Sequence, residues 1–190
     1  MSPSVNDVLA WIDLEMTGLD PSRHVIVEIA SLVTDDDLHI VAEGPNLVLR
    51  TSEDELARMD EFVVGMHRRS GLLDALGHAT VERGDAEAQT LEFLRQHIAE
   101  PGTVPLCGNS IGTDRRFLQE YMPTLESFFH YRNVDVSTVK ELLRRWRPDV
   151  IAAVPDKASS HRALDDIRES VAELAFYRER AFRDVEAVPQ

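Results

Sequence analysis

The stretch Val8–Glu15 places two acids at the end of a strongly apolar segment. It begins Val-Leu-Ala-Trp-Ile, which predicts a strand covered on both faces. Asp13 and Glu15 follow two residues apart, so a strand directs both carboxylates to the same side. Two buried anions this close repel each other and lose hydration unless a positive charge lies between them. The stretch therefore predicts a cation site at a strand end, followed by a turn over Met16–Pro21.

Length and composition limit the kind of protein that carries such a site. The chain has 190 residues, of which 43% are hydrophobic, enough for one compact domain with a core. We expect one domain over residues 1–182 and a frayed tail over residues 183–190. Neither a membrane-length apolar run nor a secretory leader is found, so we expect a cytoplasmic protein. The single Cys107 excludes an intramolecular disulfide and a cysteine-based zinc site.

The net charge of −14 restricts the partners that the surface can bind. It argues against wrapping a long nucleic acid, because neutralising many phosphates requires a basic groove. A short oligonucleotide is compatible with it, since bound divalent cations can supply local positive charge. The charge alone is also explained by solubility.

Apolar patterns elsewhere predict a mixed α/β architecture. Strands are expected over residues 25–33, 38–42, 46–50, 104–107 and 133–136. Helices are expected over residues 53–59, 85–99, 123–131, 138–146 and 162–180, with another capped by Thr113 and a capping box at Thr138 and Glu141. Residues 150–160 are expected to form a loop. The short spacings between the first strands favour antiparallel pairing, so we expect a mixed β-sheet flanked by α-helices.

Several isolated polar residues allow either a structural or a functional interpretation. Asp114 follows the Gly108–Gly112 turn and could complement a helix dipole or face a ligand. Glu28 interrupts an apolar strand, so we expect it either to pair with an arginine or to lie at the edge of the site. His67 is interpreted as structural or capping, with a place near the substrate as the alternative. Residues 35–37, three consecutive aspartates, are interpreted as a solvated turn.

The last predicted helix separates two adjacent acids. At roughly 100° per residue, its inward face is formed by Ala163, Ile167, Ser170 and Leu174. Asp166 borders this face, whereas Asp165 points nearly the opposite way. His161 precedes the helix on its loop side, where its ring is free to turn toward a site. Asp166 is therefore the acid expected to be buried.

Four acids and one histidine form the candidate site: Asp13, Glu15, Asp114, Asp166 and His161. Four carboxylates without a cysteine suit Mg²⁺ or Mn²⁺ better than zinc. Four anions around one point favour two metal ions about 3.5–4 Å apart, which clamp both sides of an in-line phosphoryl displacement. A histidine with an unperturbed pKa of about 6.5 is suited to take a proton from the attacking water.

Three spaced motifs resemble the DEDDh 3′→5′ exonucleases, in chain order. They are Asp13-x-Glu15, Asn109-x-x-x-x-Asp114 and His161-x-x-x-x-Asp166. Longer segments resemble the oligoribonuclease family within that group, and these cover residues 11–19, 107–112, 114–117 and 166–174. The resemblance extends from about residue 8 to residue 180.

The resemblance implies a ribonuclease H-like fold, a homodimer and hydrolysis of very short RNA from its 3′ end. It implies 5′-mononucleotide products and a preference for dinucleotides. Under this resemblance two Mg²⁺ or Mn²⁺ ions are bound by Asp13, Glu15, Asp114 and Asp166. The same resemblance makes His161 the general base.

The resemblance also assigns the nucleobases to Leu19 and Phe62, which would sandwich them. Family members usually carry Trp at the position of Phe62. Phe still stacks but offers less area, so base affinity or base preference is expected to differ.

Four further residues are implied to hold the far end of the substrate. Ser110 and Ser137 match positions that hold the 5′ phosphate. Tyr131 and Arg132 match residues that reach across the dimer and cap it. Such a cap would exclude longer chains by collision, which agrees with an acidic surface that has no extended groove.

Three other functions fit parts of the same pattern. A related exonuclease acting on single-stranded DNA or tRNA ends would keep its activity on longer substrates and depend little on Arg132. A protein that only binds oligonucleotides or signalling dinucleotides would not need all five catalytic positions. An acidic structural dimer would use the carboxylates only to hold a counterion.

Overall fold

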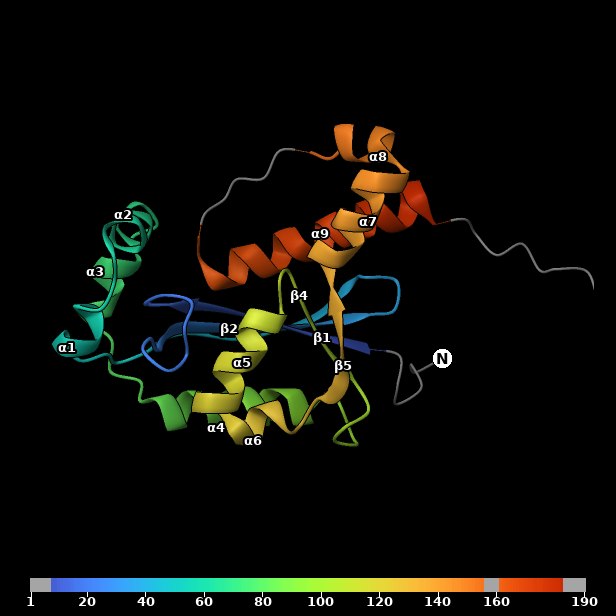
Figure 1. Cartoon of the computed structure of the whole chain (residues 1–190). Coiled ribbons are helices and arrows are strands. Elements are labelled where there is room, and N and C mark those ends of the chain that lie inside the picture. Colours follow the sequence, from blue (N-terminus) through green and yellow to red (C-terminus); the bar gives the residue numbers. More distant parts are fainter. Residues whose placement is uncertain (1–7, 156–160, 183–190) are drawn as a thin grey trace, which may run out of the picture.

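A computed structural model describes residues 8–155 and 161–182 of the chain. Five strands form one sheet in the order β3-β2-β1-β4-β5 (Figure 1). The strands are β1 (Val8–Met16), β2 (Ile26–Asp35), β3 (Ile40–Val48), β4 (Pro105–Gly108) and β5 (His130–Asp135). Pairing is antiparallel between β1 and β2 and between β2 and β3, and parallel between β1 and β4 and between β4 and β5. The predicted mixed sheet with flanking helices is confirmed.

Helices cover both faces of this sheet (Figure 1). One face carries α4 (Arg83–Arg95), α5 (Gly112–Tyr121) and α6 (Pro123–Glu126), and the other carries α7 (Val136–Trp146), α8 (Pro148–Ala152) and α9 (Ala163–Ala181). Beyond the carboxyl end of β1 lie α1 (Glu53–Leu56), α2 (Glu61–Arg69) and α3 (Leu72–Leu76). Within the described residues, no helix combines the length and the apolar character needed to cross a membrane.

The alternation of side chains along β1 determines what each face of the sheet carries. Ile12 and Leu14 belong to the core beneath α4, α5 and α6. Trp11 belongs to a second buried cluster, beneath α7, α8 and α9. Asp13 and Glu15 continue the Trp11 face because strand side chains repeat every two residues. Both acids therefore lie on the side covered by α9.

Strands β1, β4 and β5 run parallel, so their carboxyl ends open at the same edge of the sheet. Glu15 lies at this end of β1, and Asn109 and Ser110 directly follow β4. Ser137 directly follows β5, in the first turn of α7. The topology thus gathers segments that lie far apart in the sequence.

The prediction of separate strands over residues 38–42 and 46–50 is wrong. Strand β3 continues through Gly44 and Pro45 as one element. Proline is tolerated because β3 is an edge strand, where a missing N–H need not break a ladder. Gly44 is required by close packing, since an added Cβ would lie 2.4 Å from the ring of Phe93.

Other element boundaries also differ from the predictions. The helix expected over residues 123–131 ends at Glu126, and His130 already belongs to β5, where its N–H donates to the Val104 carbonyl at 2.8 Å. The helix expected to reach residue 99 ends at Arg95. The loop expected over residues 150–160 begins with the last residues of α8. Its residues 156–160 and the expected tail 183–190 lie outside the described residues.

Two predicted helix caps are wrong as well. Helix α5 begins at Gly112 without a side-chain cap, so Thr113 does not cap it. Helix α7 begins before Thr138, and its cap is Asp135, whose carboxylate accepts from the Ser137 N–H.

Candidate functional site

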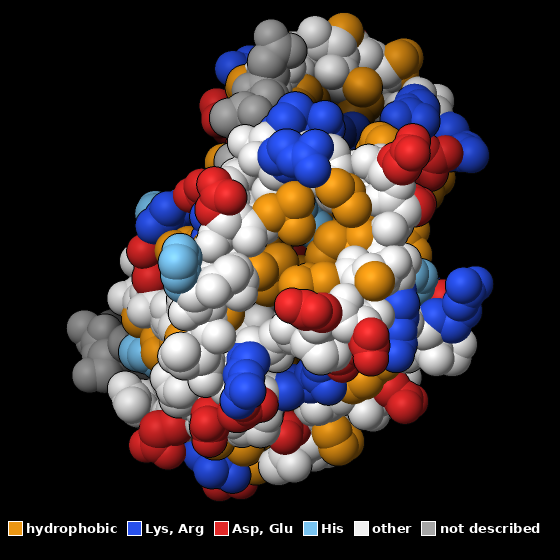
Figure 2. All heavy atoms as spheres, turned by 90° about the vertical axis from the view of Figure 1, so that its left-hand side faces the viewer, with side chains coloured by type: hydrophobic (Ala, Val, Ile, Leu, Met, Phe, Trp, Pro, Cys, Tyr) orange, Lys and Arg blue, Asp and Glu red, His pale blue; other side chains and the backbone are white. Residues whose placement is uncertain are grey.

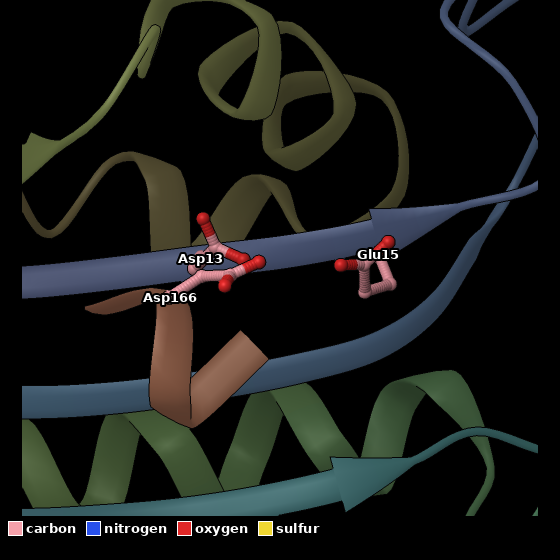
Figure 3. Close-up of side chains that lie close together, drawn as sticks. All are labelled: Asp13, Glu15 and Asp166. Atoms are coloured by element: carbon pink, nitrogen blue, oxygen red, sulfur yellow. The ribbon is translucent and has the colours of Figure 1, made fainter. Parts of the chain in front are cut away.

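Three carboxylates from two elements meet above the end of β1. Asp13 and Glu15 come from β1 and Asp166 from the first turn of α9, and one oxygen of each lies within 4.8 Å of the others. Figure 3 shows Asp166 reaching toward Asp13, with Glu15 farther along the same strand. Asp165 is exposed and Asp166 is half-buried, so Asp166 is the inward one of the two as predicted, although it is not fully buried. The three form the carboxylate cluster.

Asp114 lies beside this cluster but outside it. It is buried in the first turn of α5, and its Oδ1 accepts from the Leu14 N–H at 3.1 Å. Leu14 lies between Asp13 and Glu15, so Asp114 is hydrogen-bonded to the strand backbone that carries these two acids. Its charge is close enough to raise the pKa of Asp13. Asp114 was predicted to join the other three acids. In the structure it lies outside their cluster and is linked to it through its hydrogen bond with the Leu14 backbone.

Burial and mutual repulsion make the ionised cluster unfavourable without a cation. Burial raises the pKa of Asp13 well above its ordinary range, and the charges of Asp114, Glu15 and Asp166 raise it further. The pKa of Glu15 rises to about 8, first from burial and then from the charges of Asp166 and Glu28. Burial raises the pKa of Asp114 to about 7. A divalent cation would relieve this repulsion, and an all-oxygen donor set suits Mg²⁺ or Mn²⁺.

His161 shares a cavity with part of the cluster. The cavity has a volume of about 460 Å³ and is lined by Asp13, Asn109, Ser110, His161, Asp166, Glu169 and Ser170. His161 has a φ of 50°, in the left-handed region that residues other than glycine rarely occupy. Such a conformation persists only where its surroundings enforce it.

A second cavity lies on the other side of Glu15, with a volume of about 570 Å³. Leu19 and Phe62 both line it, and their side chains are 70% and 73% exposed. Figure 2 shows hydrophobic side chains gathered around a hollow on the face of the molecule that carries α1, α2 and α3. The structure therefore brings the two predicted base-contacting residues to one exposed apolar pocket next to the cluster.

The two predicted phosphate-binding serines also lie together. The Ser110 N–H lies 3.1 Å from the Ser137 Oγ and 3.0 Å from the Asp135 carboxylate, and the two hydroxyls are 3.3 Å apart. Tyr131 and Arg132 are exposed on the edge strand β5, with the guanidinium 5.2 Å from the ring centre. Neither lines the two cavities beside the cluster. Within one chain, the structure does not bring them to the carboxylates.

The contact between His67 and Glu15 was not predicted from the sequence. The His67 ring is fully buried in α2, its Nε2 lies 2.9 Å from the Met16 carbonyl oxygen, and its Nδ1 lies 3.8 Å from a Glu15 oxygen. Burial lowers the pKa of His67, which favours the neutral ring. The sequence offered only a histidine within a short helical segment, because its contacts come from a strand about fifty residues earlier.

Glu28 both pairs with an arginine and lies beside the carboxylate cluster, the two placements that its sequence allowed. Its carboxylate is fully buried and pairs with Arg162 at 2.8 Å, so the expected arginine partner is confirmed. The β1–β2 register places Glu28 directly opposite Glu15. The charge of Glu28 raises the pKa of Glu15, and the charge of Arg162 lowers it.

This geometry can be compared with known proteins. The family model described as Exonuclease (RNase_T) matches residues 10–174. The chain belongs to this exonuclease family. It is 57% identical over 180 residues to an oligoribonuclease from Marinobacter nauticus, covering 95% of this chain and 99% of that protein. It is 58% identical over 171 residues to one from Yersinia enterocolitica, covering 90% and 93%. The predicted oligoribonuclease relationship is confirmed, and the chain is a nuclease.

Solved exonuclease structures share the fold. The zinc-bound ExoI–ssDNA complex of E. coli matches with a TM-score of 0.71 at 14% identity, over 94% of this chain and 42% of that one. Exonuclease I from Methylocaldum szegediense matches with a TM-score of 0.66 at 19% identity, over 92% and 41%. The chain spans less than half of each. The exonuclease family's ribonuclease H-like fold, expected from the sequence, is confirmed.

Proposed function

We propose that this chain hydrolyses short oligoribonucleotides from the 3′ end, prefers dinucleotides and releases 5′-mononucleotides. The observation that carries the proposal is the convergence of Asp13, Glu15 and Asp166 within 4.8 Å, beside a cavity that His161 also lines, in an exonuclease-family chain. A carboxylate cluster next to a histidine is suited to water attack on a phosphodiester.

The residues divide into metal-binding and proton-transfer roles. Asp13, Glu15 and Asp166, with Asp114 beside them, would hold two Mg²⁺ or Mn²⁺ ions. When bound, these ions supply Lewis-acid stabilisation of charge on the attacked phosphate and on the leaving oxygen. His161 acts as general base and accepts the proton of the attacking water. Its place in the cavity lined by Asp13 and Asp166 supports this role.

The cavity on the far side of Glu15 is proposed to bind the nucleobases. Leu19 and Phe62 stack against them, since both side chains are exposed and line the same hollow. Ser110 and Ser137 hold the 5′ phosphate of the substrate, and their hydrogen-bonded hydroxyls form one polar surface. These two sites lie on either side of the carboxylate cluster.

The cap over the short substrate is proposed to come from a second copy of the chain. Tyr131 and Arg132 lie on the exposed edge strand β5, and neither lines the two cavities beside the cluster in its own chain. In a homodimer they are available to close the partner's phosphate site. We further propose a single exonuclease domain over residues 1–182 that works in the cytoplasm.

Hydrolysis of an RNA length series from two to about ten nucleotides tests the proposal. With Mg²⁺ or Mn²⁺ we expect the highest initial rate on the dinucleotide, complete conversion to 5′-mononucleotides and no activity in chelator. Rates that hold or rise with length would contradict the dinucleotide preference. Matched DNA substrates separate this activity from that of a DNA exonuclease.

A further inference from the structure

The start of α9 is held by a buried carboxylate that belongs to another element. Glu28 lies in β2, is fully buried, and accepts from both the Nε and an Nη of Arg162 at 2.8–3.2 Å. The same carboxylate lies 3.3 Å from the Ala163 N–H, the first of the helix. Arg162 is the N-cap residue of α9 but makes no side-chain cap bond. Glu28 therefore performs the capping from a strand 134 residues earlier.

The residue that directly precedes Arg162 is His161, and its backbone conformation is unusual. His161 has a φ of 50°, a left-handed conformation that is strained for a residue other than glycine. The guanidinium of the adjacent Arg162 is anchored by its pair with Glu28. A paired and buried Arg–carboxylate contact is directional, because its two parallel bonds set the plane of the guanidinium.

We propose that Glu28 is a positioning residue that acts through Arg162 and holds His161 at the carboxylate cluster. The inference rests on the proposed function, in which His161 is the general base. Glu28 lies opposite Glu15 in the β1–β2 register, so the strand that sets the position of the base is the direct neighbour of the strand that carries Asp13 and Glu15. Glu28 itself touches neither substrate nor the reacting atoms in this proposal.

The chain offers a matched control for this ion pair. Arg168, also in α9, donates two bonds to Glu43 of β3 at 2.7 and 2.9 Å. Both ion pairs join α9 to a strand through a bidentate arginine. Glu43 is exposed and belongs to neither cavity beside the cluster. Glu43→Gln thus removes the charge from a second bidentate pair away from His161, one that is exposed where the Glu28 pair is buried.

The experiment measures kcat and KM on a 5′-phosphorylated RNA dinucleotide for wild type, Glu28→Gln, Arg162→Lys and Glu43→Gln. We expect Glu28→Gln to lower kcat by about 10- to 100-fold with KM changed less than about 3-fold, since misplacing a base affects the chemical step. Glu43→Gln should keep both constants. Arg162→Lys keeps the charge but loses the bidentate geometry, so it should also lower kcat while leaving KM nearly unchanged. This variant replaces Glu28→Gln in the test if Glu28→Gln does not fold.

Combining Glu28→Gln with His161→Ala tests whether Glu28 acts through His161. If Glu28 acts through His161, Glu28→Gln should lower kcat by less than about 2-fold beyond the loss of kcat already caused by His161→Ala. An undiminished further loss would overturn the inference, and so would wild-type kcat in both Glu28→Gln and Arg162→Lys. An unreactive wild-type protein would instead contradict the proposed function.

Discussion

The carboxylate cluster predicts that the metal-free protein loses stability as the pH rises. Burial and neighbouring carboxylates raise the pKa of Glu15 from its ordinary 4.5 to about 8. Between these values the folded chain keeps a proton that the unfolded chain has released. The folded state binds more protons there, so the free energy of unfolding falls with increasing pH.

The size of the effect follows from the same pKa. A change from 4.5 to about 8 corresponds to about 5 kcal/mol at most for Glu15 alone. For a chain of this length about 1 kcal/mol moves Tm by about 2–4 °C. We therefore expect the metal-free protein to lose on the order of 10 °C in Tm between about pH 5 and about pH 8. A divalent cation binds the ionised carboxylates, so its stabilisation should grow over the same interval.

Thermal unfolding followed by circular dichroism, in chelator and at stepped pH, measures this loss. The control is Glu15→Gln, which keeps the shape of the side chain and removes the ionisable group. It should be more stable than wild type at about pH 8 in chelator and gain less from Mn²⁺. His67, whose pKa is lowered by burial, acts in the opposite direction but is present in both proteins. Equal pH dependence in wild type and Glu15→Gln would refute the reasoning.

Four other outcomes are expected. His161→Ala should lower kcat by about 10²- to 10⁴-fold while metal affinity, measured by Mn²⁺ titration, stays near that of wild type. Phe62→Ala should weaken dinucleotide binding by about 1–3 kcal/mol, and Phe62→Trp should restore or exceed the wild-type Kd. Removing the 5′ phosphate should weaken dinucleotide binding in wild type but much less in Arg132→Ala; equal losses in both would exclude Arg132 from the cap. Asp114→Ala should unfold at lower denaturant than Asp114→Asn, which retains an acceptor for the Leu14 N–H, because an orphaned buried donor costs about 1–3 kcal/mol.

Periodicity was enough to predict the position of three acids. Asp13 and Glu15 share a face because a strand repeats every two residues, and Asp166 turns inward because a helix turns roughly 100° per residue. Both rules act within a window of a few residues. The core of the candidate site could therefore be assembled from short segments.

Contacts between distant segments could not be predicted in this way. His130 enters β5 rather than a helix because its N–H donates to Val104, and Arg115 donates to the carbonyls of His130 and Tyr131. No local sequence pattern predicts such hydrogen-bond partners. The same holds for Glu28, for which an arginine partner was one of two expectations and no particular arginine was indicated.

The parallel trio β1, β4 and β5 explains how an acidic chain can act on a polyanion. Their carboxyl ends lie side by side, so the carboxylate cluster at β1 lies one strand spacing from the serine that follows β4 and two from the serine that follows β5. One to two spacings are about 5–10 Å, the length of roughly two to three stacked nucleotides. A substrate of this length brings few phosphates, and cations at the cluster can offset them locally. A net charge of −14 therefore does not oppose the proposed activity on dinucleotides, whereas a long RNA would have to leave this edge and cross a predominantly acidic surface.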